Sequence, residues 1–229
     1  MSSIRHLLSF WGAASPYTPP ARTPATGTLR VIHGYSQIFQ EMSRVRTATS
    51  ELTLAEEGYV PAQAPETWTL VDTGGIELGA QIPQRSGDWA RSGDVVGVST
   101  NAGDQWWLGM IRSMHAEPGH GMHAHIAILS REPQALQLRP VIKQGEASVF
   151  TEQAARQFAF NNVSAIIVSE GAAGSQKANF LMPFEYWEEG RVYEGTVAGA
   201  ERHLRGLQLL RRGDDYVRAT FEWVPLAQA

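Results

Sequence analysis

The chain has 229 residues, of which 43% are hydrophobic and 18% are charged, a balance that supports a real hydrophobic core and excludes wholesale disorder. The formal net charge of -4 argues against a binding surface for nucleic-acid polymers or anionic membranes. The lack of cysteine excludes disulfides, thiolate metal sites and a cysteine nucleophile, and no apolar run is long enough to predict a membrane span. We therefore expect a cytoplasmic protein.

The first part of the chain predicts an arm, a strand and a helix. Residues 1–25 end in SPYTPPARTPA, whose clustered prolines predict an extended Pro-rich arm. The next segment, TLRVIHGYSQIFQEMSRV, predicts a short strand followed by a short helix. The helix is indicated by Ile38, Phe39, Met42 and Val45, which fall on one helical face.

From Thr67 onward the pattern is that of β-structure. The segments WTLVDTGGIELGAQI, SGDVVGVST, NAGDQWWLGMIRSM and MHAHIAILS contain alternating apolar residues, with Gly, Asp and Asn at the turns between them. Short strands at this spacing predict a small antiparallel barrel or sandwich, which we place at residues 26–140.

Residues 145–229 predict a second small β unit. The segment EASVFTEQAARQFAFN is compatible with a short helix or a long connection. The final segment, HLRGLQLLRRGDDYVRATFEWVP, predicts two strands joined by a hairpin at RRGDD. The fold class is thus mainly β, with a small antiparallel barrel, a second small β unit and few short helices. No internal repeat is evident in the sequence.

Four of the seven histidines lie between Ser113 and Leu129, and they raise the question of a metal site. His123 and His125 are two residues apart in a predicted strand, so both point to the same face. Imidazole suits zinc, copper, nickel or iron, and a third ligand could come from His120, His115 or Glu117.

The His-x-His pair after glycines resembles the first motif of the cupin family of metal-binding proteins. This resemblance implies a metal set of His120, His123 and His125. The cupin motif expects a glutamate three or four residues after the second histidine, whereas the first carboxylate after His125 is Glu132. The alternative interpretation is that the histidines lie on the solvent face of a strand whose other face is apolar.

No P-loop, dinucleotide fingerprint or Gly-x-Ser-x-Gly motif occurs in the chain, so the sequence indicates no enzyme of these classes. The tryptophans are best explained by packing in a core or interface. A protein that acts through exposed strand edges or tryptophans is a third hypothesis, which predicts an unidentified protein partner.

The segments WTLVDTGGIEL, SGDVVGVST, WWLGMIRSM and MHAHIAILS resemble the barrel of PilZ-type proteins, which bacteria use as receptors for cyclic di-GMP. The resemblance covers mainly residues 67–131. It implies a non-enzymatic regulatory receptor or adaptor without a resident cofactor, which binds cyclic di-GMP and signals through protein contacts.

The resemblance also implies a ligand site. PilZ-type proteins bind the dinucleotide with an Arg-x-x-x-Arg arm and an Asp/Asn-x-Ser-x-x-Gly motif on the barrel. Here DTGG is the corresponding segment, with Asp72 at its first position, and the chain has no Arg-x-x-x-Arg. The expected ligand residues are therefore Asp72, Thr73, Gly74 and Gly75, with Arg22 and Arg30 on the phosphates, since guanidinium groups make bidentate phosphate contacts.

Overall fold

The computed structural model describes residues 22–47, 64–83, 88–100, 105–117, 121–141, 162–170, 176–197 and 199–225. These residues form mainly β-structure, with one α-helix and one short 3-10 helix among them. No helix in the described ranges is long and apolar enough to cross a membrane. The elements in chain order are β1 (Thr23–His33), α2 (Tyr35–Thr47), β2 (Glu66–Gly74), β3 (Glu77–Ile82), β4 (Val95–Ser99), β5 (Trp107–Glu117), β6 (Gly121–Ser130), β7 (Gln134–Pro140), β8 (Val163–Glu170), β9 (Lys177–Met182), η1 (Phe184–Tyr186), β10 (Val192–Val197), β11 (Ala200–Arg212) and β12 (Val217–Val224).

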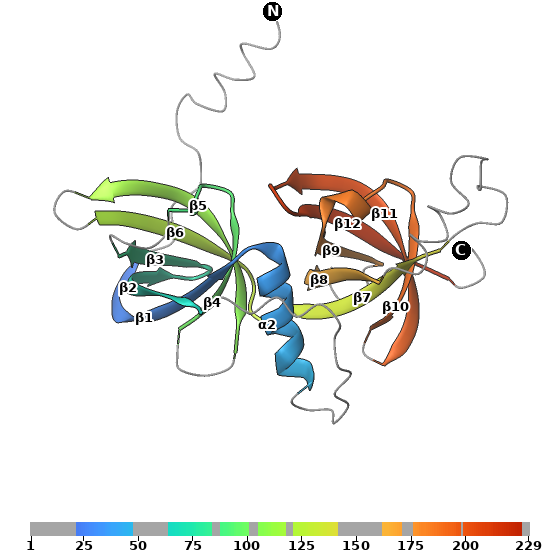
Figure 1. Cartoon of the computed structure of the whole chain (residues 1–229), viewed down its shortest axis with the longest axis horizontal. Helices are drawn as coiled ribbons and strands as arrows, with labels where there is room; N and C mark the ends of the chain where they lie inside the picture. The colour runs from blue at the N-terminus through green and yellow to red at the C-terminus, as the bar shows by residue number, and fades with distance from the viewer. Residues whose placement is uncertain are drawn as a thin grey trace, which may run out of the picture.

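The first six strands close into a barrel in the order β1-β2-β3-β6-β5-β4, with every neighbouring pair antiparallel (Figure 1). Its core follows from the two-residue period of the strands. In β6, for example, Ala124, Ile126 and Ile128 point into the core while His123 and His125 lie on the other face. Trp68 is the largest fully buried side chain of this barrel.

The last six strands close into a second barrel in the order β10-β11-β12-β9-β8-β7. The centre of this barrel is aromatic. The rings of Phe180 and Phe221 are 4.8 Å apart between centroids, and Tyr193 packs edge-on against Phe221 at 5.9 Å. Both geometries are the tilted arrangements that aromatic pairs favour.

The two barrels have the same connectivity. In each, the first strand pairs with the second and the fourth, and the third strand pairs with the sixth. This repeat is not evident in the sequence, because the side chains of corresponding strands differ while the hydrogen-bonding order is the same. In both barrels every described strand has two neighbours, although β4 pairs with β5 only between Trp107 and Met110, whereas β6 pairs with β5 as far as Glu117. An interaction through exposed strand edges or tryptophans stays a prediction.

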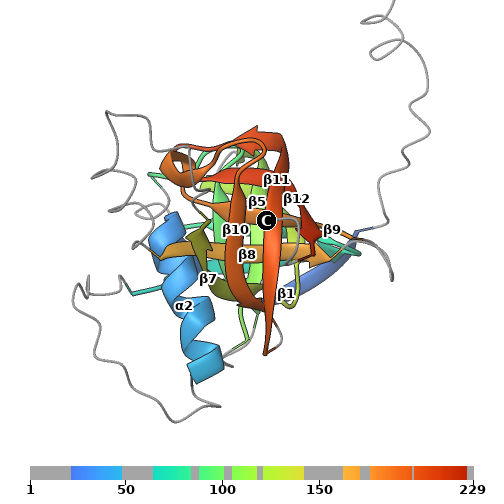
Figure 2. The same ribbon diagram turned by 90° about the vertical axis from the view of Figure 1, so that its right-hand side faces the viewer.

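Helix α2 lies between the two barrels in Figure 1, and Figure 2 shows it at one side of them. One continuous apolar cluster there contains residues from the helix and from both barrels. Its buried members are Ile32, Tyr35, Ile38, Met42, Val95, Trp106, Leu108, Ala135, Ile166, Val168, Leu181 and Tyr216. The barrels therefore share a core in addition to having one each.

Tyr35 connects the junction by hydrogen bonds as well as by packing. Its hydroxyl group donates to the backbone oxygen of Ser164 at 2.8 Å and of Leu181 at 3.2 Å, both in the second barrel. Burial, and to a lesser degree the carboxylate of Asp215, raises the pKa of Tyr35 well above its usual range, so the hydroxyl group keeps its proton. In return, Tyr216 of the second barrel donates to the backbone oxygen of Gly93 at 2.9 Å.

Several expectations from the sequence are confirmed. The mainly β fold with a small antiparallel barrel is present, the strand and helix of residues 26–47 are present, and RRGDD joins β11 to β12. Ile38 and Met42 are buried and Phe39 packs against them, whereas the side chain of Val45 lies outside the described part. The segment EASVFTEQAARQFAFN also lies outside it.

The boundary between the two units differs from the expected one. Residues 26–140 were expected to form the first barrel, but β7 pairs with β8 and β10 of the second barrel. The division therefore falls between Ser130 and Gln134. At the other end, β1 begins at Thr23, inside the expected arm of residues 1–25, and residues 1–21 lie outside the described ranges.

We expect the substitution Tyr35→Phe to lower the free energy of unfolding by about 1–3 kcal/mol, because it removes the hydroxyl proton that the backbone oxygens of Ser164 and Leu181 share. Equilibrium unfolding in urea measures this change. Since the barrels share a core, both the parent and the variant should unfold in a single transition. Ser36→Ala, on the exposed side of α2, is the matched control and should have little effect. Two separate transitions in the parent protein would contradict the shared core.

Candidate metal and ligand site

The candidate site lies on the outer wall of the first barrel, where β2, β3, β6 and β5 are consecutive neighbours. Their register brings Asp72 of β2 opposite Gly79 of β3, and Gly79 opposite His125 of β6. A Cβ atom at Gly79 would stand 2.4 Å from Oδ2 of Asp72. The glycine therefore leaves the space that the Asp72 carboxylate occupies beside β6.

The next row of the same wall contains two histidines in direct opposition. His115 of β5 pairs with His123 of β6, and His125 lies two residues further along β6 on the same face. The nitrogen atoms that these three side chains could offer to a metal all lie within 4.8 Å of one another. We call these three residues the histidine triad. It runs from exposed His115 through half-buried His125 to buried His123.

Arg22, directly before β1, links this wall to three neighbouring strands. Its Nη1 atom lies 3.1 Å from Oδ1 of Asp72, and its Nη2 atom lies 3.0 Å from Oε2 of Glu77. Nη1 also contacts Nδ1 of His125. Because a guanidinium group has no acceptor, the arginine is the donor in each contact and Nδ1 of His125 accepts.

Glu77 is a nearly buried carboxylate held by two arginines. Its residue is 8% exposed, Oε2 accepts from Arg22, and Oε1 lies 3.1 Å from Nη1 of Arg112. A buried carboxylate is tolerated when it is paired, and here each oxygen atom has its own guanidinium group. The sequence does not predict that Glu77 is buried, since a glutamate at the start of a strand usually faces solvent.

The environment of His125 favours the neutral imidazole. Desolvation lowers the pKa of His125 below its ordinary value, and the nearby charge of Arg22 lowers it further. The neutral ring is the form that binds a metal ion, because one of its nitrogen atoms then has a free lone pair.

The structure brings together only some of the ligand residues expected from the sequence. Arg22 and Asp72 form an ion pair, whereas the resemblance implied that Arg22 contacts the phosphates of a ligand. Thr73 and Gly74 continue β2, and Gly75 starts the tight turn to β3 with a φ of 59°. Gly75 therefore serves a hairpin, since a two-residue turn of this kind needs positive φ at its first position.

Arg30 is placed away from this cluster. It lies eight residues beyond Arg22 along β1, about 25 Å at the rise of an extended strand. Its guanidinium group covers the ring of Trp106 at 5.0 Å, a cation–π contact. Arg22 and Arg30 thus do not form one phosphate clamp in this structure.

The metal set expected from the cupin resemblance is changed in one member. His123 and His125 converge as the His-x-His spacing implies, but the third histidine near them is His115. His120 lies outside the described residues. The position of His115 depends on the register of the β5–β6 hairpin, which pairs it with His123 across the strands.

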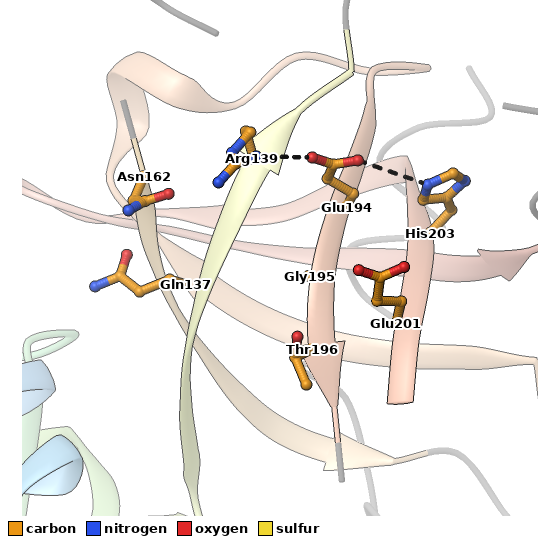
Figure 3. A pocket seen from close by; sticks show the side chains of 8 residues that line it. All are labelled: Gln137, Arg139, Asn162, Glu194, Gly195, Thr196, Glu201 and His203. Atoms are coloured by element: carbon orange, nitrogen blue, oxygen red, sulfur yellow. Dashed lines mark hydrogen bonds and ion pairs between the residues drawn. The ribbon is translucent and has the colours of Figure 1, made fainter. Parts of the chain in front are cut away.

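A second hollow lies on the outer face of the second barrel (Figure 3). Its volume is about 210 Å³, and the residues that line it are Gln137, Arg139, Asn162, Glu194, Gly195, Thr196, Glu201 and His203. Glu194 is central, since it pairs with Arg139 at 3.4 Å and lies 3.9 Å from Nε2 of His203. The lining is almost entirely polar, and its charged groups largely pair with one another.

Fold and site together define a tandem of two small antiparallel β-barrels, with a histidine and ion-pair cluster on the outer wall of the first. No protein-family model matches the chain, and searches of curated proteins and of solved structures find no match either. The resemblance to PilZ-type proteins therefore rests on the sequence segments alone.

We expect Gly79→Ala to displace the Asp72 carboxylate and to weaken its ion pair with Arg22, because the new methyl group would overlap all three carboxylate atoms. The cost in unfolding free energy should be about 1 kcal/mol, as both partners are partly exposed to solvent. Urea unfolding measures it. Gly27→Ala in the same barrel is the matched control, since its Cβ atom would meet only Leu70, at 3.9 Å. Equal effects of the two substitutions would argue against the crowding at Gly79.

Proposed function

We propose that the protein is a non-enzymatic receptor that binds a divalent transition-metal ion on the outer wall of its first barrel, through His115, His123 and His125. The observation that carries this proposal is the convergence of three imidazole groups from two paired strands, with their nitrogen atoms within 4.8 Å of one another. Small side-chain rotations bring such groups to the spacing of a metal's ligands.

The chemistry of the triad favours zinc, nickel or copper over magnesium or calcium, since imidazole suits the former and oxygen ligands suit the latter. Exposed His115 leaves one side of the triad open to solvent, which gives a metal ion a path to it and keeps a coordination position for water. Asp72 and Glu77 lie beside the triad, where carboxylates commonly orient metal-bound histidines.

Calorimetry with Zn²⁺ on untagged protein tests the proposal. We expect one Zn²⁺ per chain, and we expect His123→Ala or His115→Ala to weaken binding at least about tenfold, since even outer partners of metal ligands contribute that much. His203→Ala, in the second barrel, is the control and should bind as the parent does. Absence of zinc, nickel and copper binding below millimolar concentration, or unchanged affinity in His123→Ala, would refute the triad.

A second candidate function is the binding of cyclic di-GMP, as the resemblance to PilZ-type receptors implies, with signalling to a protein partner in the bacterial cytoplasm. The observation that favours it is the contact of Arg22 with Asp72 on the barrel surface. An arginine and a carboxylate side by side could address a phosphate and a guanine edge of one ligand. To do so, Arg22 would have to exchange its carboxylate partners for phosphate.

Calorimetry with cyclic di-GMP decides this second candidate. If the site binds the dinucleotide, Arg22→Ala and Asp72→Ala should each weaken binding about tenfold or more, in line with the loss of a charge-assisted hydrogen bond. Arg30→Ala should change little, because Arg30 lies elsewhere on β1. No heat at tens of micromolar protein would remove the candidate.

A further inference from the structure

Arg22 occupies the position beside the histidine triad that a bound cation would influence most. Its guanidinium group contacts two carboxylates, Asp72 and Glu77, and the imidazole of His125. These are the same kinds of donor atom that coordinate a metal ion. The guanidinium group is therefore a cation attached to the chain, bound among ligands that a free dication could also use.

The contact between Arg22 and His125 is incompatible with metal binding by His125. A neutral imidazole has one nitrogen with a lone pair and one that carries a proton. While Nδ1 accepts from Arg22, the proton is on Nε2, and Nε2 cannot bind a metal. If the metal binds Nδ1, it takes the lone pair. If it binds Nε2, the proton moves to Nδ1, and Nδ1 can no longer accept from Arg22.

Electrostatic repulsion between the metal ion and Arg22 also disfavours their simultaneous binding at His125. A dication at the triad repels the guanidinium group, which lies in contact with one of the proposed ligands. Asp72 and Glu77 continue to attract Arg22. The metal therefore weakens the contact of Arg22 with His125 but does not remove the arginine from the wall. The two cations therefore compete for one part of a shared site.

We propose that Arg22 is an intramolecular competitor of the metal ion. His125 either binds the metal together with the rest of the triad or accepts the hydrogen bond of Arg22, and it cannot do both. This inference rests on the proposed function. Because linkage is reciprocal, whatever moves Arg22 away from His125 tightens metal binding by the same factor by which the metal loosens Arg22. The position of the Arg22 side chain, directly before β1, thereby becomes sensitive to the metal.

Arg22→Gln tests the competition, with Arg112→Gln as the matched control. Arg112 also pairs with Glu77, so its removal deletes the same charge from the same wall, but it is Arg22 whose guanidinium group contacts His125. Zn²⁺ calorimetry should show that Arg22→Gln binds about 3- to 10-fold more tightly than the parent, the range of one hydrogen bond, and that Arg112→Gln gains less. Circular dichroism checks that both variants are folded.

The outcomes separate this inference from the proposed function. If the parent binds Zn²⁺ and Arg22→Gln binds no more tightly than Arg112→Gln, the competition is refuted while the triad stands. Zinc binding by Arg22→Gln alone supports both, provided that adding His123→Ala abolishes it. If none of the proteins binds Zn²⁺, both proposals fall.

An independent measurement follows the arginine in the parent protein. Zn²⁺ is diamagnetic, so NMR can record the guanidinium resonances of Arg22 and Arg112 during a zinc titration. The resonance of Arg22 should shift in proportion to metal occupancy, and that of Arg112 should shift less. Saturation of the triad without any change at Arg22 would overturn the competition.

Discussion

Tyr35 begins helix α2, and its backbone N–H donates to the carboxylate of Asp215, which lies in the turn between β11 and β12. The first amide groups of a helix have no partner within the helix, and a carboxylate there also interacts favourably with the helix dipole. The residue before Tyr35 is Gly34, which has no side chain to cap the helix, and the first turn contains no acidic residue. The helix that belongs to the first barrel by sequence is thus capped by the second.

The outer wall of the first barrel depends on a different balance. Two guanidinium groups, Arg22 and Arg112, face two carboxylates, Asp72 and Glu77, and the environment of His125 keeps its ring neutral. The formal charges of these four groups sum to zero, so together they carry no net charge. A dication beside these groups would add two positive charges, and a pair of phosphates would add two negative ones.

The sequence predicts the strands of the first barrel well, because the alternation of Ala124, Ile126 and Ile128 reports directly which face of a strand is buried. It does not predict which strand pairs with which. QALQLRP alternates in the same way whether it closes the first barrel or opens the second; in the structure it pairs with β8 and β10 of the second. For the site, the His-x-His spacing identifies one face of β6, whereas His115 and Arg22 depend on strand register and on contacts 50 or more residues apart.

Only three residues separate β6 from β7, yet the apolar cluster around α2 contains side chains from both barrels. A linker between independent domains permits them to rotate, whereas here rotation would open a buried core and break the hydrogen bonds of Tyr35 and Tyr216. The tandem therefore moves as one body. A ligand bound to the first barrel would change the surface around its site without changing the angle between the barrels. A partner would have to recognise that local change.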